Sequence, residues 1–366
     1  MTTAPDINTG ETIVLSKPEG YDRLPPIMTL AELAKRPPKL SPVLIDGILR
    51  KGNKMIINGD SKSGKTCFAE GLAVSIASGL KWLNRFQCKQ GKVLYLNFEV
   101  QGSSMYHRFM KIYDRLDIKP SENLELWNLR GHSCPLSNLS DQIIYKCRFG
   151  GYAAIILDPI YKIQGGDENS ASDIAKFCNE LDRISHETGA SVIYTHHHAK
   201  GSSGDRKAID RGSGSGVFAR DPDAILDLSI LALDKNTQEL ASERISRGDI
   251  PLKLEFNLRE FATPETTNLW FSYPAHEVDD KGILDQAVIE GSKESNLLKS
   301  PNRTSAKNRY SILVNSFSAC AENGVARLSE MADWSGISDK SLRRYIAEYE
   351  DEFSVEKGLV WLVGTK

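Results

Sequence analysis

Short apolar runs alternate with longer amphipathic stretches from about residue 44 to residue 275. Continuous apolar runs such as Ala-Ala-Ile-Ile-Leu at 153–157 are typical of strands that are buried on both faces of a sheet. The stretches between these runs have the length and apolar periodicity of helices. Alternation of this kind predicts an α/β fold with a central, mostly parallel sheet.

The pattern assigns individual elements within this region. Strands are expected at 54–58, 92–98, 125–129, 153–157, 191–196 and 224–231, and helices at 65–78, 103–116, 137–149 and 172–188. Two later runs, 252–257 and 269–273, predict further strands that are antiparallel.

Composition divides the chain into four parts. Residues 1–26 are polar and interrupted by prolines, which predicts a flexible N-terminal arm. The α/β domain is expected at 27–277, beginning with a short helix at 29–35. Residues 278–304 resemble a linker. Residues 305–366 suggest three helices and a hairpin, in which Gly336 suits a left-handed turn and Ser338 a helix cap, so a small winged-helix-like domain is predicted there.

Charge and cysteine content limit the class of protein. The 366 residues carry a net charge of −2, so any contact with nucleic acid must come from local basic patches. Six cysteines without a CxxC pair favour reduced thiols. No apolar run resembles a signal peptide or a membrane span of about 20 residues. We therefore expect a cytoplasmic protein with no membrane partner.

The strongest chemical signal is GDSKSGKT at 59–66, which fits the phosphate-binding P-loop pattern G-x-x-x-x-G-K-[ST] between a predicted strand and a predicted helix. Glycines allow backbone N–H groups to surround a phosphate, and the helix start adds partial positive charge. Lys65 is expected to contact the β- and γ-phosphates of ATP, and Thr66 the Mg²⁺ ion. The predicted nucleotide-binding residues are Gly59, Asp60, Ser61, Lys62, Ser63, Gly64, Lys65, Thr66 and Cys67.

Two carboxylates end later strands. Asp158 closes AAIILDP and has the form of a Walker B acid, which would hold Mg²⁺ through water. Pro159 follows it, so no second acid stands there to polarise a water molecule. Glu99, at the end of VLYLNFE, is the predicted general base, provided that its strand lies next to the P-loop strand. An ordinary strand-end carboxylate is the alternative for each.

Three consecutive histidines, His196 to His198, follow another predicted strand. They cannot all point one way in an extended chain. His197 is the candidate sensor that touches the γ-phosphate and reports hydrolysis. Metal chelation by the run and histidines without a chemical role are the alternatives.

Taken in order, these motifs, with IILDPIYKIQGGDEN, THHHAKG and DRGSGSGVFARDPDAILDL, resemble the RepA-like branch of RecA-fold ATPases. The resemblance covers residues 27 to 275. That branch contains hexameric replicative DNA helicases of plasmids and mobile elements. The resemblance implies a RecA-like ATPase core in a homo-oligomeric ring, expected to be a hexamer, with ATP bound between neighbours and single-stranded DNA in a central pore.

The same resemblance assigns roles to single residues. It matches Lys65, Thr66, Glu99, Asp158 and His197 to the family's phosphate, magnesium, catalytic, Walker B and sensor positions. It also implies an arginine finger from the adjacent subunit. Arg220 and Arg247 are the candidates, and an ordinary surface arginine is the alternative for each.

The segment AKGSSGDRKAIDRGSG at 199–214 is rich in Gly and Ser and carries basic residues. It is the predicted contact with single-stranded DNA, through Lys200, Arg206, Lys207 and Arg211. A surface loop without DNA contact is the alternative. In the C-terminal domain Lys340, Arg343 and Arg344 share one helix face, which suits DNA. Acidic residues follow closely and would repel phosphates, so a replication protein is the alternative partner of that domain.

Three functions remain open at this point. The favoured one is an ATP-dependent DNA helicase or translocase in the replication of a plasmid or mobile element. The second is a RecA-like regulatory or DNA-repair ATPase without processive unwinding. The third is an ATP-gated DNA-binding regulator led by the C-terminal domain.

Overall fold

The computed structural model describes residues 2–5, 12–15, 25–132, 134–198, 205, 208, 211–212, 216–295, 306–322 and 324–363. The chain divides into two compact units, 1–42 and 43–366. None of the helices in the described part has the length and apolar character required to cross a membrane.

The first unit contains secondary structure that the polar composition of the predicted arm did not indicate. Strands β1 (Thr2–Pro5) and β2 (Thr12–Leu15) pair antiparallel. Helix α1 (Leu30–Lys35) begins with a capping box, in which the Thr29 side chain accepts from the Glu32 N–H and the Glu32 side chain accepts from the Thr29 N–H.

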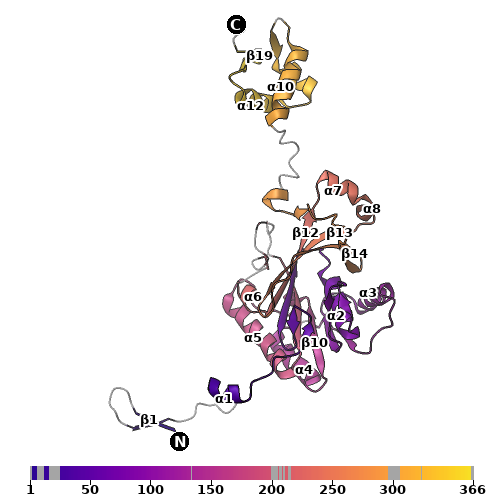
Figure 1. Ribbon diagram of the computed structural model, residues 1–366, viewed down its shortest axis with the longest axis vertical. Helices are drawn as coiled ribbons and strands as arrows, with labels where there is room; N and C mark the ends of the chain where they lie inside the picture. Colours follow the sequence, from indigo (N-terminus) through magenta and orange to yellow (C-terminus); the bar gives the residue numbers. More distant parts are fainter. Residues whose placement is uncertain are drawn as a thin grey trace. The chain divides into compact units, whose positions relative to one another are not determined.

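A ten-stranded sheet forms the centre of the second unit (Figure 1). Six neighbouring strands are parallel, in the order β9-β8-β10-β11-β5-β12. Their bounds are β5 (Lys54–Gly59), β8 (Lys92–Asn97), β9 (Leu124–Asn128), β10 (Tyr152–Asp158), β11 (Ser191–His197) and β12 (Ala224–Ala232). Antiparallel strands β13 (Ile250–Leu258), β14 (Thr267–Ser272) and β15 (Ala275–Val278) extend the sheet beyond β12. The predicted mostly parallel α/β sheet with added antiparallel strands is confirmed.

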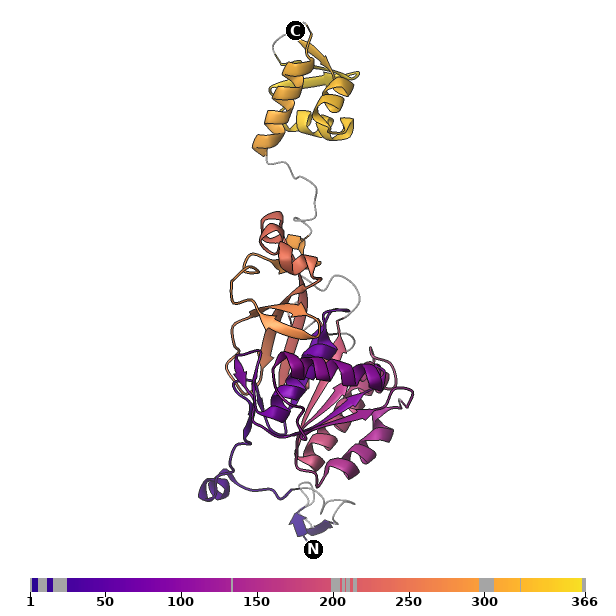
Figure 2. The same ribbon diagram turned by 90° about the vertical axis from the view of Figure 1, so that its right-hand side faces the viewer.

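Helices cover both faces of the parallel strands (Figures 1 and 2). Helices α2 (Lys65–Ser78) and α3 (Gly102–Arg115) pack on one face, and α4 (Leu136–Cys147) and α5 (Ala171–Thr188) on the other. Alternation along β5 explains this layering, because Met55 and Ile57 face the first helix pair whereas Ile56 faces the second. Burial on both faces accounts for the continuous apolar runs in the sequence.

Part of the predicted linker belongs to the sheet instead. The short strand β16 (Val288–Ile289) pairs antiparallel with the end of β12. Leu284 is fully buried in a small cluster with Leu231 and Trp270. The prediction of a linker from residue 278 is therefore wrong for this stretch, since a polar composition did not reveal its few apolar anchors.

Smaller elements complete the second unit. These are β3 (Val43–Ile45), β4 (Leu49–Arg50), β6 (Lys81–Trp82), β7 (Phe86–Gln87), the 3-10 helix η2 (Ile160–Lys162), α6 (Val217–Arg220), α7 (Lys235–Leu240) and α8 (Ser242–Ser246).

The C-terminal segment has its own apolar cluster. It contains α10 (Ala306–Cys320), β17 (Val325–Arg327), α11 (Leu328–Ser335), α12 (Asp339–Glu348), β18 (Phe353–Glu356) and β19 (Leu359–Leu362), with the strands in the order β17-β19-β18. Gly336 ends α11 at φ 65°, and the Ser338 side chain caps α12, as expected. The assignment to the winged-helix class stays a prediction.

Candidate nucleotide-binding site

Four segments with candidate residues meet at one edge of the sheet. The P-loop joins the end of β5 to the start of α2, and Glu99 follows β8. Asp158 is the last residue of β10, and His197 is the last residue of β11. Since these strands are parallel, their carboxyl ends lie at the same edge, where ligands bind in open α/β sheets. We call this region the phosphate edge.

The backbone of the P-loop has the form of an anion cradle. Lys62 and Gly64 have left-handed φ angles of 70° and 76°. Ser63, between them, does not, and backbone in which left-handed residues alternate with others turns successive N–H groups towards one side. A Cβ atom on Gly64 would lie 2.9 Å from the Phe271 ring, and one on Gly59 would lie 2.8 Å from Ser63 Oγ. Side chains at either glycine would therefore distort the loop.

Lys65 lies inside this cradle. Its Nζ donates to the backbone carbonyls of Gly59 and Asp60, both at 2.7 Å. Burial lowers the pKa of Lys65 to about 8, while the charges of Asp60 and Asp158 oppose that shift. A cation held at the inner wall of an N–H cradle is suited to bind a polyphosphate.

Asp158 is buried beside the P-loop. Its carboxylate accepts from the Tyr95 hydroxyl at 2.8 Å and from the Thr195 hydroxyl. Burial raises the pKa of Asp158, whereas hydrogen bonds from Thr195, Tyr95 and Thr66 lower it. The Thr66 hydroxyl and the Asp158 carboxylate thus lie together, and oxygen ligands of this kind fit Mg²⁺ that also binds phosphates and water. The sequence pattern did not indicate a role for Tyr95 or Thr195, because each is a single residue within an apolar strand.

Glu99 is exposed and lies in an Asx turn that the Asn97 side chain forms. The Asn97 side chain accepts from the backbone N–H of Glu99 at 3.2 Å and of Val100 at 2.9 Å. The condition of an adjacent strand is not met, because β11 and β10 lie between β5 and β8. Glu99 nevertheless lies at the phosphate edge, where its charge acts on Lys65 and Asp158. Its role as general base stays a prediction.

The three histidines have three different surroundings. His196 is buried against Phe218, with ring centroids 4.7 Å apart. His197 packs on Tyr161, and burial together with the Lys65 charge lowers its pKa to about 4. His198 contacts two carboxylates. Among the described side chains no group of three or more His, Cys, Asp or Glu forms a metal site. The sensor role of His197 stays a prediction.

The structure corrects one predicted DNA contact. Arg211 is only 3% exposed, and its guanidinium donates to Asp227 at 2.7 Å and to Glu255. Its charge is therefore engaged inside the protein, which the basic composition of the segment could not show. The other predicted contacts, Lys200, Arg206 and Lys207, lie outside the described residues.

Both candidate arginine fingers are on the surface. Arg220 ends α6 and is exposed. Arg247 follows α8 and makes ion pairs with Glu243 and Asp249, each at 3.4 Å. The Arg247–Glu243 pair is exposed on both sides, and an exposed ion pair of this length is weak. The role of both arginines across an interface stays a prediction.

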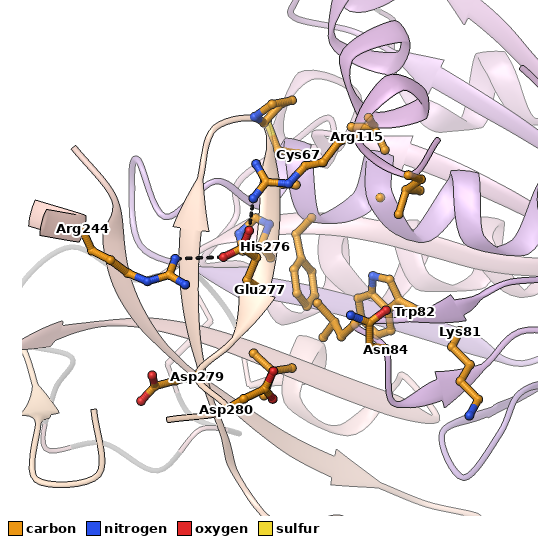
Figure 3. A pocket seen from close by; sticks show the side chains of 18 of the residues that line it. Cys67, Lys81, Trp82, Asn84, Arg115, Arg244, His276, Glu277, Asp279 and Asp280 are labelled. Atoms are coloured by element: carbon orange, nitrogen blue, oxygen red, sulfur yellow. Dashed lines mark hydrogen bonds and ion pairs between the residues drawn. The ribbon is translucent and has the colours of Figure 1, made fainter. Parts of the chain in front are cut away.

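A cavity of about 650 Å³ lies beside α2 and includes Cys67, which directly follows the P-loop (Figure 3). One wall contains Glu277, whose carboxylate accepts from Arg115 and from Arg244. The Gly71 side of α2 also lines the cavity, and a Cβ there would meet nothing within 4 Å. Sequence patterns did not reveal this cavity, because its walls come from five separate segments.

The comparison with known families agrees with this geometry. A family model described as an AAA domain matches residues 20–203, half of the chain. The match includes the P-loop, Glu99, Asp158 and the histidine run. It extends over the parallel strands that present the phosphate edge, from β5 to β11. This chain therefore belongs to the AAA domain family of P-loop ATPases.

Proposed function

We propose that the chain is an ATP-dependent DNA helicase or translocase that hydrolyses ATP between the subunits of a ring and moves on single-stranded DNA. The observation that carries the catalytic part is the assembly of Lys65, Thr66, Asp158 and Glu99 at the phosphate edge. The DNA part rests on the resemblance to RepA-like helicases and on the basic residues 200, 206 and 207. We further propose a cytoplasmic protein whose C-terminal domain binds DNA or replication proteins.

Each residue at the phosphate edge has a distinct task in the proposed hydrolysis. Lys65 binds β- and γ-phosphate oxygens and neutralises charge that develops in the transition state. Glu99 accepts a proton from the attacking water. Thr66 and Asp158 would hold Mg²⁺, which supplies charge neutralisation at the phosphates. Arg220 or Arg247 from a neighbouring subunit would complete the site.

The cavity beside Cys67 is the proposed place for the base and ribose, since it begins where the P-loop ends. Its volume suits a group of nucleoside size. Gly71→Leu would project a side chain into it and is expected to weaken the binding of ATP at least tenfold, while inorganic tripolyphosphate binds as before. Gly71→Ala is the matched control. Equal loss for ATP and tripolyphosphate would argue against this placement.

The deciding experiment measures the ATPase rate with and without single-stranded DNA and the mass of the assembly with ATP. Stimulation by DNA, a ring mass and ATP-dependent strand separation support the proposal. A mixture of Lys65→Ala subunits with Arg220→Ala or Arg247→Ala subunits should regain activity where the arginine acts across an interface. A ring whose ATPase rate does not change with single-stranded DNA, and which separates no strands, would contradict the proposed helicase function.

The regulatory or repair ATPase is the second candidate, and the burial of Arg211 favours it. With that arginine engaged by Asp227 and Glu255, the segment after β11 has less charge for a DNA backbone. ATP-dependent DNA binding without unwinding would support this alternative.

A further inference from the structure

His198 bridges the P-loop and strand β12. Its Nδ1 lies 2.8 Å from Asp60 Oδ1, and its Nε2 lies 2.8 Å from Asp227 Oδ1. Asp60 is the second residue of the P-loop, and Asp227 belongs to β12. The His198 side chain itself is 3% exposed. One buried imidazole therefore joins the phosphate-binding loop to the neighbouring strand.

The geometry defines the charge of this imidazole. A neutral ring has one N–H and one lone pair, whereas ionised carboxylates only accept hydrogen bonds. Both 2.8 Å contacts are favourable together only in the imidazolium form. Burial lowers the pKa of His198, but the hydrogen bonds to Asp227 and Asp60 raise it above its ordinary value overall. His198 is thus a cation beside the P-loop.

The two carboxylates differ in what else binds them. Asp227 is fully buried and also accepts from Arg211 at 2.7 Å and from Ser229 at 3.1 Å. The Asp60 side chain is 29% exposed, and its Oδ2 accepts from the Ile230 N–H at 3.2 Å. Asp227 thus has a second cation in Arg211, while the backbone carbonyl of Asp60 accepts from Lys65 Nζ in the cradle.

A carboxylate at the second position of a phosphate-binding loop presents an electrostatic difficulty. At an effective dielectric constant of about 20, two negative charges several ångströms apart repel enough to lower affinity about tenfold or more. Because His198 and the Ile230 N–H hold both oxygens of Asp60 on the β12 side, its charge is neutralised and directed away from the cradle.

We propose that His198 is a positioning residue whose imidazolium neutralises Asp60 and turns it towards β12, so that the P-loop accepts a nucleoside triphosphate. This inference rests on the proposed binding of ATP. It separates His198 from His197, the predicted γ-phosphate sensor, since His198 acts through Asp60 and does not touch the ligand. Asp60 accordingly belongs to the phosphate site through its charge as well as through its backbone.

The test measures the Kd of ATP with Mg²⁺ at pH 7 for the full chain and its variants. His198→Gln removes the cation and should weaken binding about ten- to one hundredfold. Adding Asp60→Asn to His198→Gln should restore the Kd to within about threefold of the unmodified protein. The matched control adds Asp227→Asn instead, which neutralises the other carboxylate of the same imidazole and should leave ATP binding weak.

The outcomes separate this proposal from the proposed function. An unmodified protein without ATP affinity contradicts the function itself. A protein that binds ATP while His198→Gln binds equally well contradicts only the role of His198, as does a double variant with Asp60→Asn that stays weak. If His198→Gln does not fold, His198→Gln/Asp227→Asn is compared with the triple variant that adds Asp60→Asn, because the buried carboxylate is neutral in both.

Discussion

The phosphate edge and the buried ion network next to it use the same types of side chain in opposite ways. At the phosphate edge Lys65 lies inside a cradle of backbone N–H groups that is shaped for an anion, and Thr66 and Glu99 lie at the same edge. In the network His198 and Arg211 are paired with Asp60, Asp227 and Glu255, so their charges are used within the fold. The partners of a charged residue near a ligand site therefore decide whether it acts on the ligand directly, as Lys65 does, or within the fold, as Arg211 does.

This contrast has energetic consequences that are separable. Removing a group whose partner is a ligand costs binding or turnover and leaves the empty fold nearly unchanged. Removing one member of a buried ion pair leaves its partner charged and desolvated, which costs about 3–5 kcal/mol. Variants of Lys65 and Glu99 should consequently lose activity, and variants of Arg211 should lose stability, whereas His198 joins the two regions through Asp60.

The largest expected effect is that of Lys65→Ala. Its ammonium is the cation inside the cradle, so its loss removes stabilisation of the transferring phosphoryl group. ATP turnover should fall by at least about 1000-fold while the urea midpoint of unfolding changes little. Lys119→Ala, which changes an exposed lysine after α3, is the control and should retain most of the activity. Equal activity of the two variants would place Lys65 outside the chemistry.

Glu99→Gln should have the next largest effect. The amide is of similar size but cannot accept the proton of the attacking water, so the rate should fall about 100- to 1000-fold with ATP affinity retained. Single-turnover hydrolysis and equilibrium binding measure the two separately. Glu122→Gln, an exposed glutamate before β9, is the control. Normal hydrolysis by Glu99→Gln would show that another group activates water.

Sequence predicted the elements of the α/β sheet closely, and helix α2 at 65–78 matched its prediction. The reason is local, because Gly64 and Gly79 stand at its two ends in left-handed conformations. The order of the strands was not encoded in this way. The role of Glu99 was made conditional on a strand next to the P-loop strand, and two other strands separate β8 from β5. Strand neighbours depend on packing between distant segments.

The site was predicted where a motif has fixed spacing and missed where partners are far apart in the chain. Arg211 meets Asp227 16 positions away and Glu255 44 positions away, so its basic character alone suggested a DNA contact. The strand β16 was missed for the same reason, since two apolar residues in a polar stretch gain meaning only through pairing with β12.

Arg211→Ala sharpens the comparison from the structural side. It leaves Asp227 and Glu255 with less compensation and should lower the free energy of unfolding by about 4 kcal/mol. Urea unfolding followed by circular dichroism measures this change, and Arg211→Lys should recover part of it.

Binding of single-stranded DNA by the folded fraction of Arg211→Ala should stay unchanged, whereas Lys200→Ala/Arg206→Ala/Lys207→Ala should weaken this binding and reduce its salt dependence. A stable Arg211→Ala protein with weakened DNA binding would reverse the assignment.

Glu70→Gln gives the smallest effect and depends on pH. Glu70 lies on α2, fully buried, with Arg108 Nη1 at 3.8 Å. Burial raises its pKa to about 8, against the opposing charge of Arg108. Between pH 4.5 and 8 the native state therefore keeps a proton that the unfolded chain has lost, so the native protein loses stability as pH rises through this range. Glu70→Gln removes that loss, so its free energy of unfolding should gain about 2 kcal/mol over that of the unmodified protein between pH 5 and pH 7.

Urea unfolding at several pH values measures the difference, with Glu122→Gln as the control. A difference that does not change with pH would mean that Glu70 is ionised in the native state and paired with Arg108. Glu70 would then belong with the buried ion pairs and not with the buried neutral groups.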